Sequence, residues 1–125
     1  MTENEIATKA LDVAFRIHSL YGPGLFENVY EKIFCYELEK MGIPFKCQYA
    51  ISLEHENLKL DAGFRADLIL DDKVIIELKS VDALAPIHKA QLLTYLKLTR
   101  LKLGLLINFN VVHLKQGIQR LANGL

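Results

Sequence analysis

The stretch FRADLILDDKVIIELKS, residues 64–80, predicts two β-strands joined by a short acidic loop. Alternate side chains of a strand point to the same face, so Ile75, Glu77 and Lys79 share one side of the second strand. A Glu and a Lys two positions apart most often form a solvated surface pair. The rest of that strand is apolar. Whether Glu77 and Lys79 form a surface pair or a functional site therefore depends on which other residues share their face.

Asp67 is a second acidic residue in a segment that otherwise suits burial. Aspartate is unfavourable inside a strand. A three-residue loop at 71–73 would pair Leu70 with Val74 and therefore Asp67 with Glu77. A two-residue turn would send the two carboxylates to opposite faces. We expect the three-residue loop, or a bulge with the same effect.

Two carboxylates placed in this way repel each other unless a cation lies between them. Mg²⁺ suits such a site because it prefers hard oxygen ligands and keeps several waters around one or two carboxylates. No His or Cys cluster suggests zinc. The residues predict a Mg²⁺ site at Asp67 and Glu77, where Lys79 orients a water or stabilises a phosphate.

The remaining elements follow from apolar periodicity and from Gly and Pro positions. Gly22 to Gly24 separate two helices, and Pro86 suits the first turn of a third. The order predicts an α/β (α+β) fold, with a central mixed sheet that contains an antiparallel three-stranded meander flanked by helices. The expected helices are 3–20, 25–41 and 86–101, and the expected strands are 45–53, 64–70, 74–80 and 101–109, with a final strand at 111–120.

Two sets of helical residues are further candidates. Glu27 and Glu31 are four positions apart and share a helix face, where they form either part of a site or a solvated edge near the positive helix N-terminus. His88, Gln91 and Tyr95 form a polar line on a leucine-rich helix. They are either functional or a partly buried hydrogen-bond set.

Composition limits the class of protein. The 125 residues are 51% hydrophobic and 24% charged, which predicts one folded domain over residues 1–125. The start MTENEI lacks the features of a signal peptide, and no apolar run is long enough for a membrane span. We expect a cytoplasmic protein with no membrane partner. Cys35 and Cys47 lack metal-ligand spacing and are expected to be packing residues.

The charge distribution is uneven although the net charge is zero. Residues 1–62 carry six Lys and Arg against ten Asp and Glu, and residues 63–125 carry nine against five. Zero net charge argues against binding nucleic acid by overall charge alone. A polyanionic partner is therefore expected at the second half, unless the asymmetry is a chance distribution over solvated faces.

An ordered set of motifs resembles the GxxExxY family of the PD-(D/E)XK nuclease superfamily, from about Ala10 to Arg120. The motifs are GPGLFENVYE (22–31), ELEKMGIPF (37–45), RADLIL (65–70), VIIELKS (74–80), IHKAQLLTYLK (87–97) and LGLLINF (103–109). The resemblance implies a restriction-endonuclease-like core preceded by an extra N-terminal helix. One departure is that residues 54–60 lack the aromatic-glycine turn usual in the family.

The resemblance also implies roles for single residues. Asp67 and Glu77 would be metal ligands, the Leu78 carbonyl another, and Lys79 the basic member of the signature. Gln91 would match the glutamine on the helix that follows the signature in related nucleases.

The upstream acidic residue has two candidates. Glu27 is the glutamate of the family's name, whereas Glu31 lies at a distance similar to that of the acidic residue in archaeal junction-resolving members. His88, Tyr95 and Tyr30 are the expected substrate contacts.

The function expected from the residues and the resemblance is a Mg²⁺-dependent phosphodiesterase acting on DNA, with Mn²⁺ as a substitute ion. The alternatives are a catalytically silent module that binds nucleic acid or a partner with the same fold, and a structural subunit whose charged patches pair with another chain. A homodimer would extend the footprint on DNA, although no sequence pattern establishes one.

Overall fold

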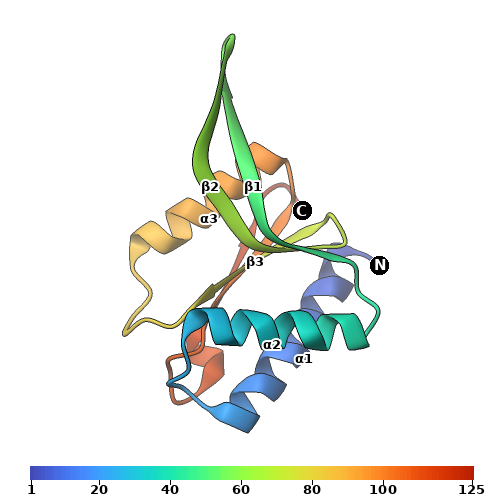
Figure 1. The fold of residues 1–125 in the computed structure, drawn as a ribbon, viewed down its shortest axis with the longest axis vertical. Coiled ribbons are helices and arrows are strands. Elements are labelled where there is room, and N and C mark those ends of the chain that lie inside the picture. Colours follow the sequence, from blue (N-terminus) through green and yellow to red (C-terminus); the bar gives the residue numbers. More distant parts are fainter.

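The computed structural model describes the backbone of residues 1–125 and all side chains except that of Ala62. Three helices and one five-stranded sheet form the fold (Figure 1). The helices are α1 (Glu3–Tyr21), α2 (Glu27–Lys40) and α3 (Pro86–Thr99). The strands are β1 (Phe45–His55), β2 (Leu58–Leu70), β3 (Val74–Lys79), β4 (Leu103–Asn108) and β5 (Ile118–Ala122), with a short 3₁₀ helix η1 (Leu114–Gly117) before β5.

The sheet is mixed and its strands follow the order of the chain. β1, β2 and β3 form an antiparallel meander, β4 lies parallel to β3 after the α3 crossover, and β5 is antiparallel to β4. The buried side chains of α1 and α2 pack on one face of the sheet and those of α3 on the other (Figure 1). The predicted α/β architecture, with its meander and its extra N-terminal helix, is therefore confirmed.

The loop between β2 and β3 sets the register of the two strands. Leu70 pairs with Val74, which leaves the three-residue loop that the sequence predicts. Asp71 and Asp72 have φ values of 51° and 53°, a left-handed conformation that short polar side chains tolerate better than most. The Lys73 N–H donates to the Leu70 carbonyl at 2.9 Å and closes the turn.

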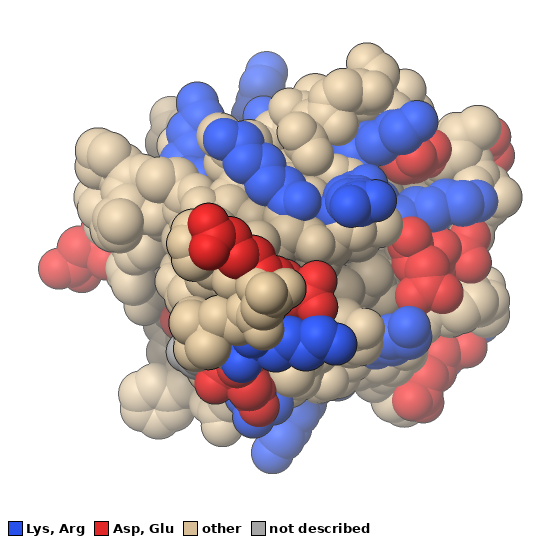
Figure 2. All heavy atoms as spheres, turned by 90° about the horizontal axis from the view of Figure 1, so that it is seen from above, with Lys and Arg blue, Asp and Glu red and all other residues tan. Residues whose placement is uncertain are grey.

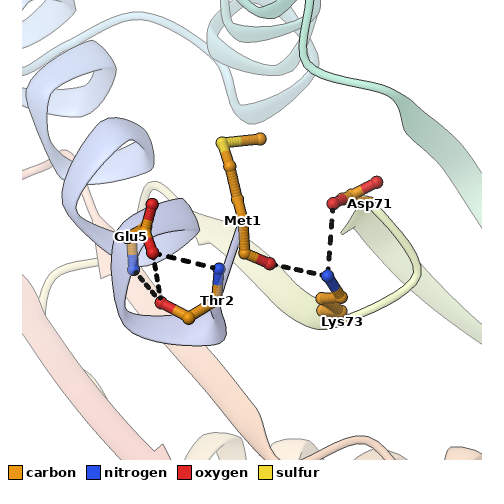
Figure 3. A network of polar contacts seen from close by, with 5 residues as sticks. All are labelled: Met1, Thr2, Glu5, Asp71 and Lys73. Carbon is orange, nitrogen blue, oxygen red and sulfur yellow. Dashed lines mark hydrogen bonds and ion pairs between the residues drawn. The ribbon is translucent and has the colours of Figure 1, made fainter.

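The N-terminus packs against this loop (Figure 3). The Lys73 ammonium donates to the Met1 carbonyl at 2.6 Å and lies 3.7 Å from the Asp71 carboxylate. The next residue, Thr2, caps α1, because its hydroxyl accepts the Glu5 N–H at 3.2 Å and the Glu5 carboxylate accepts in return. The chain start is thus tied to the turn that sets the register of the candidate site.

The β1–β2 hairpin is longer than predicted and projects from the body of the protein (Figure 1). His55 pairs with Leu58 across a turn of two residues, so the expected ends of these strands at residues 53 and 64 are wrong. The sequence does alternate here, because Leu58 and Leu60 are apolar and Lys59 and Asp61 are polar. The prediction misses these pairs because it takes residues 54–57 as a linker and starts the next strand only at residue 64. The structure leaves Leu58 and Leu60 exposed, so this alternation does not mark a buried face.

The expected final strand at 111–120 is also wrong in its bounds. β5 begins only at Ile118, after η1. Val111 and Leu114 pack against the core on the α1 side as parts of a loop and a 3₁₀ helix. Cys47 is exposed on β1 rather than packed, while Cys35 is half-buried. Within the described part of the chain, no helix is long and apolar enough to cross a membrane.

Candidate active site

Asp67 and Glu77 meet where β2 and β3 separate. The last paired residues of these strands are Leu68 and Ile76, one position before the two carboxylates. The Asp67 N–H donates to Glu77 Oε2 at 2.7 Å, and the Leu78 N–H donates to Asp67 Oδ2 at 2.8 Å. The two side chains replace the backbone ladder and satisfy donors that the parting strands would otherwise leave unpaired. The predicted juxtaposition of the two carboxylates is confirmed.

Glu77 is buried, with 5% of its surface exposed. Burial raises the pKa of its carboxyl to about 8, and the neighbouring negative charge of Asp67 adds to the shift. The Asp67 N–H and the positive charge of Lys79 oppose it. The protein therefore holds two carboxyl groups together at an energetic cost that a cation between them would relieve.

Glu31 joins this pair through a side chain of β1. The Gln48 Nε2 donates to Glu31 Oε1 at 2.6 Å and to Asp67 Oδ1 at 3.3 Å. Burial raises the pKa of Glu31, and the Asp67 charge contributes although the Gln48 hydrogen bond opposes it. Glu27 is exposed at the start of α2. The structure thus links Glu31, and not Glu27, to Asp67.

An open hollow of about 440 Å³ adjoins these groups. Its walls include Phe26, Glu27 and Glu31 near the start of α2, and Gln48, Asp67 and Leu78 from the three meander strands. The sequence places Phe26 on the apolar stripe of a helix starting at residue 25, but α2 starts at Glu27 and the Phe26 side chain is 78% exposed at the rim. The charged residues among those that line the hollow are all acidic (Glu27, Glu31 and Asp67), so the hollow favours a cation.

Two residues that sequence reasoning missed fix the segment after Lys79. The buried Asn108 side chain accepts the Val81 N–H at 3.1 Å and donates to the Val81 carbonyl at 3.0 Å. The Ser80 hydroxyl donates to the Leu25 carbonyl at 2.9 Å and ties this segment to the start of α2. Asn108 is the polar residue in the apolar run LGLLINF, which is the signal that could have identified it.

Comparison with known proteins supports the same interpretation. A family profile described as the PD-(D/E)XK nuclease superfamily matches residues 4–121. The chain belongs to the PD-(D/E)XK nuclease superfamily. No curated protein and no solved structure matches the chain. Membership agrees with the restriction-endonuclease-like fold expected from the sequence, whereas assignment to the GxxExxY family stays a prediction.

PD-(D/E)XK nucleases generally use divalent metal ions, and the donor set of this chain fits such an ion. Asp67 Oδ1 and Glu77 Oε1 each belong to a carboxylate whose other oxygen already accepts a backbone N–H. Within the described residues, no group of three or more His, Cys, Asp or Glu side chains is arranged to hold a metal. A Mg²⁺ ion needs fewer protein ligands because it keeps several of its waters.

The polar line predicted on α3 of this PD-(D/E)XK chain does not form one surface. His88 is half-buried, and its Nδ1 accepts the Ala85 N–H at 3.0 Å at the start of the helix. Gln91 is exposed. Tyr95 is 4% exposed, and its pKa is raised by burial and then by the Glu77 charge. Tyr95 therefore lies beneath the site and has almost no surface for substrate contact.

Tyr30 is fully buried and cannot contact a substrate in this conformation. Its ring stacks on Phe109, with the centroids 4.2 Å apart. Its hydroxyl donates to the Gly22 carbonyl and accepts the Leu25 N–H. The expected substrate role is corrected to a structural one, because Tyr30 holds the turn that leads into α2.

The raised pKa of Glu77 predicts a pH dependence of stability in metal-free protein. Because the folded pKa exceeds the unfolded one, the contribution of Glu77 is complete below about pH 4.5 and is lost as the pH rises through about 8. We expect the free energy of unfolding to fall over this range, on the order of a few kcal/mol. Urea titrations at a series of pH values measure it.

The Glu77→Gln variant is the control for this titration, since it keeps the size of the side chain and removes its titration. Asp67, Lys79 and Tyr95 are the charged or titratable groups near Glu77 and remain in both proteins. The slope between pH 5 and pH 8 should be smaller in the variant. Identical slopes would show that Glu77 ionises in the folded state as it does in water.

Proposed function

We propose that the chain is a Mg²⁺-dependent nuclease of the GxxExxY family that hydrolyses phosphodiester bonds in DNA, with Mn²⁺ as a substitute ion. The observation that carries the proposal is the contact of Asp67 with the buried Glu77 where β2 and β3 part. Lys79 follows two residues later and its positive charge acts on Glu77. Superfamily membership supports nuclease chemistry, and this geometry supports an active site at Asp67, Glu77 and Lys79.

The carboxylates of Asp67 and Glu77 and the Leu78 carbonyl would hold the ion. A divalent ion bound there supplies Lewis acidity for the phosphate and makes water a better nucleophile at neutral pH. The backbone donors at Asp67 and Leu78 fix both carboxylates, so little reorganisation is needed before the reaction. Glu31 is the upstream acidic residue in this proposal, because Gln48 connects it to Asp67.

Lys79 would orient the attacking water and stabilise the negative charge that grows on the phosphate. Its strand pairs with β2 as far as Ile76 and with β4 through Lys79, which lies opposite Asn108. The Asn108 amide fixes Val81 immediately afterwards. The backbone that carries the ammonium is therefore anchored by β4 and by the Asn108 amide, which limits the backbone conformations that must be lost in the transition state.

A net charge of zero favours local rather than overall attraction of DNA. On the face seen from above, a band of basic side chains crosses the upper part, and further basic side chains lie among acidic ones below it (Figure 2). Such interspersed charge fits a net charge of zero. Phe26 at the rim offers an exposed ring on which a base could stack. His88 near the start of α3 remains a proposed substrate contact, and the exposed Gln91 of the same helix remains a proposed catalytic residue.

Cleavage assays test the proposal directly. Linear, nicked, branched and single-stranded DNA and RNA are incubated with Mg²⁺, with Mn²⁺ or with EDTA. Metal-dependent turnover of DNA supports the nuclease, and preference for RNA would correct the substrate. Binding of DNA without turnover in either metal would favour a silent binding module with the same fold.

Lys79→Met should lower the cleavage rate about 10²- to 10³-fold, because it removes the positive charge that acts on Glu77. Mn²⁺ affinity should change little, since an ammonium is not a metal ligand. Rates and calorimetry on the same preparations separate the two effects. Lys9→Met, which changes an exposed lysine on α1, is the matched control and should leave both values unchanged. Undiminished cleavage by Lys79→Met would remove Lys79 from the mechanism.

A further inference from the structure

Gln48 has an unusual backbone conformation in the middle of β1. Its φ is +50°, in the left-handed region that residues other than glycine rarely adopt inside a strand. The pairs on either side, Cys47 with Leu68 and Tyr49 with Ala66, keep one register, so the strand continues through this position. A left-handed residue in such a place costs conformational energy and persists only where the surrounding structure enforces it.

The Gln48 side chain makes the contacts that accompany this conformation. Its Nε2 donates to Glu31 Oε1 on α2 at 2.6 Å and to Asp67 Oδ1 on β2 at 3.3 Å. One amide group therefore joins acidic residues from a helix and from a neighbouring strand. Both carboxylates border the hollow beside the candidate metal ligands.

The backbone of Gln48 also takes part in the arrangement. Its carbonyl accepts from the Arg65 guanidinium at 3.5 Å, so the peptide is held from β2 as well. The hydrogen bond from Gln48 opposes the rise in the pKa of Glu31 that burial causes, which means that the amide stabilises the ionised carboxylate. Glu27, one turn earlier on α2, receives no such contact from Gln48 among the described residues.

We propose that Gln48 is a positioning residue of the metal site: its amide holds the Glu31 and Asp67 carboxylates in one arrangement, and the strained backbone is what aims the amide at both. The inference rests on the proposed function, in which Asp67 binds the ion. Without the amide, Glu31 would be free to turn away from Asp67. Groups that orient metal ligands typically change metal affinity about 10- to 100-fold when they are removed.

A pair of variants separates the backbone from the amide. Gln48→Ala and Gln48→Gly both remove the side-chain amide, but only glycine adopts the left-handed conformation without a steric cost. We expect the urea midpoint of the glycine variant to lie above that of the alanine variant. We expect both variants to bind Mn²⁺ about 10-fold or more weakly than the wild type by calorimetry. Wild-type Mn²⁺ affinity in both variants would overturn the proposal.

A double-mutant cycle in metal-free protein tests the bridge independently of any ion. The urea midpoints of Gln48→Ala, Glu31→Ala and the double variant should be non-additive, because either single change removes one partner of the Gln48–Glu31 hydrogen bond. The same cycle with Glu27→Ala should be additive. Additive behaviour with Glu31 would overturn the role of Gln48, even if Mn²⁺ binds. A wild-type protein that binds no Mn²⁺ would instead overturn the proposed function, whatever the cycle shows.

Discussion

Asp67→Asn should reduce DNA cleavage about 10³-fold or more and remove stoichiometric Mg²⁺ binding, while the metal-free protein becomes more stable near pH 8. The loss follows because metal ions supply several kcal/mol of transition-state stabilisation and each 1.36 kcal/mol is a factor of ten in rate. The gain follows because the Asp67 charge helps to raise the pKa of Glu77. An asparagine carbonyl can still accept the Leu78 N–H that Asp67 accepts at 2.8 Å.

A loss of cleavage activity together with a gain of stability distinguishes a metal-binding aspartate from an aspartate that serves only the fold. Cleavage rates, Mg²⁺ calorimetry and urea titration at pH 8 on the same preparation give the three values. Asp71→Asn is the matched control. It makes the same chemical change in the β2–β3 loop at a left-handed residue that asparagine tolerates. If Asp67→Asn lost stability and kept its Mg²⁺ affinity, Asp67 would serve the fold and not the metal.

Gly117→Ala should lower the free energy of unfolding by about 3 kcal/mol, the upper part of the usual range for overpacking a close contact. A Cβ atom on Gly117 would lie 2.2 Å from the Asn108 carbonyl oxygen and 3.1 Å from a Val111 methyl carbon. The obstruction is backbone at the end of β4, so no side-chain rotation relieves it. The Asn108 amide also fixes Val81 beyond Lys79, so cleavage should fall as well.

Gly104→Ala is the informative comparison for this prediction. A Cβ on Gly104 would meet the Leu92 side chain at 3.0 to 3.1 Å, and that side chain can shift by a few tenths of an ångström. We expect a smaller loss of stability there, measured by urea and thermal unfolding of both variants. Equal losses would mean that the segment before β5 moves aside to accommodate the additional methyl group.

Local features of the sequence predicted the centre of the fold and of the candidate site. The acidic residues at 71 and 72 suited either a two- or a three-residue loop. The three-residue loop was predicted because only it brings Asp67 and Glu77 to one face, and the pairing of Leu70 with Val74 confirmed it. That register brings Asp67 to Glu77, because side chains in a strand alternate with a period of two. The helices were found as well, since α1, α2 and α3 each bury an apolar face or begin at a recognisable break.

Local sequence features could not predict the contacts between elements that are distant in the sequence. Periodicity predicts that Tyr30 lies on the apolar stripe of a helix, whereas the stacking of its ring on Phe109 is a contact between elements far apart in the sequence. Spacing left Glu27 and Glu31 equivalent, and the amide of Gln48 distinguishes them. The projecting end of the β1–β2 hairpin keeps Leu58 and Leu60 exposed although the sequence alternates there, so the alternation alone does not show which face is covered.

The sequence by itself determined which elements form and which side chains share a strand face, because turn length, periodicity and capping act over a few neighbouring residues. The tertiary structure alone decided which acidic residue of α2 joins Asp67, and that Phe26 is exposed while Tyr30 and Tyr95 are buried. Those outcomes depend on how helices and strands pack across layers, where the position of a side chain is set by residues that lie far from it along the chain.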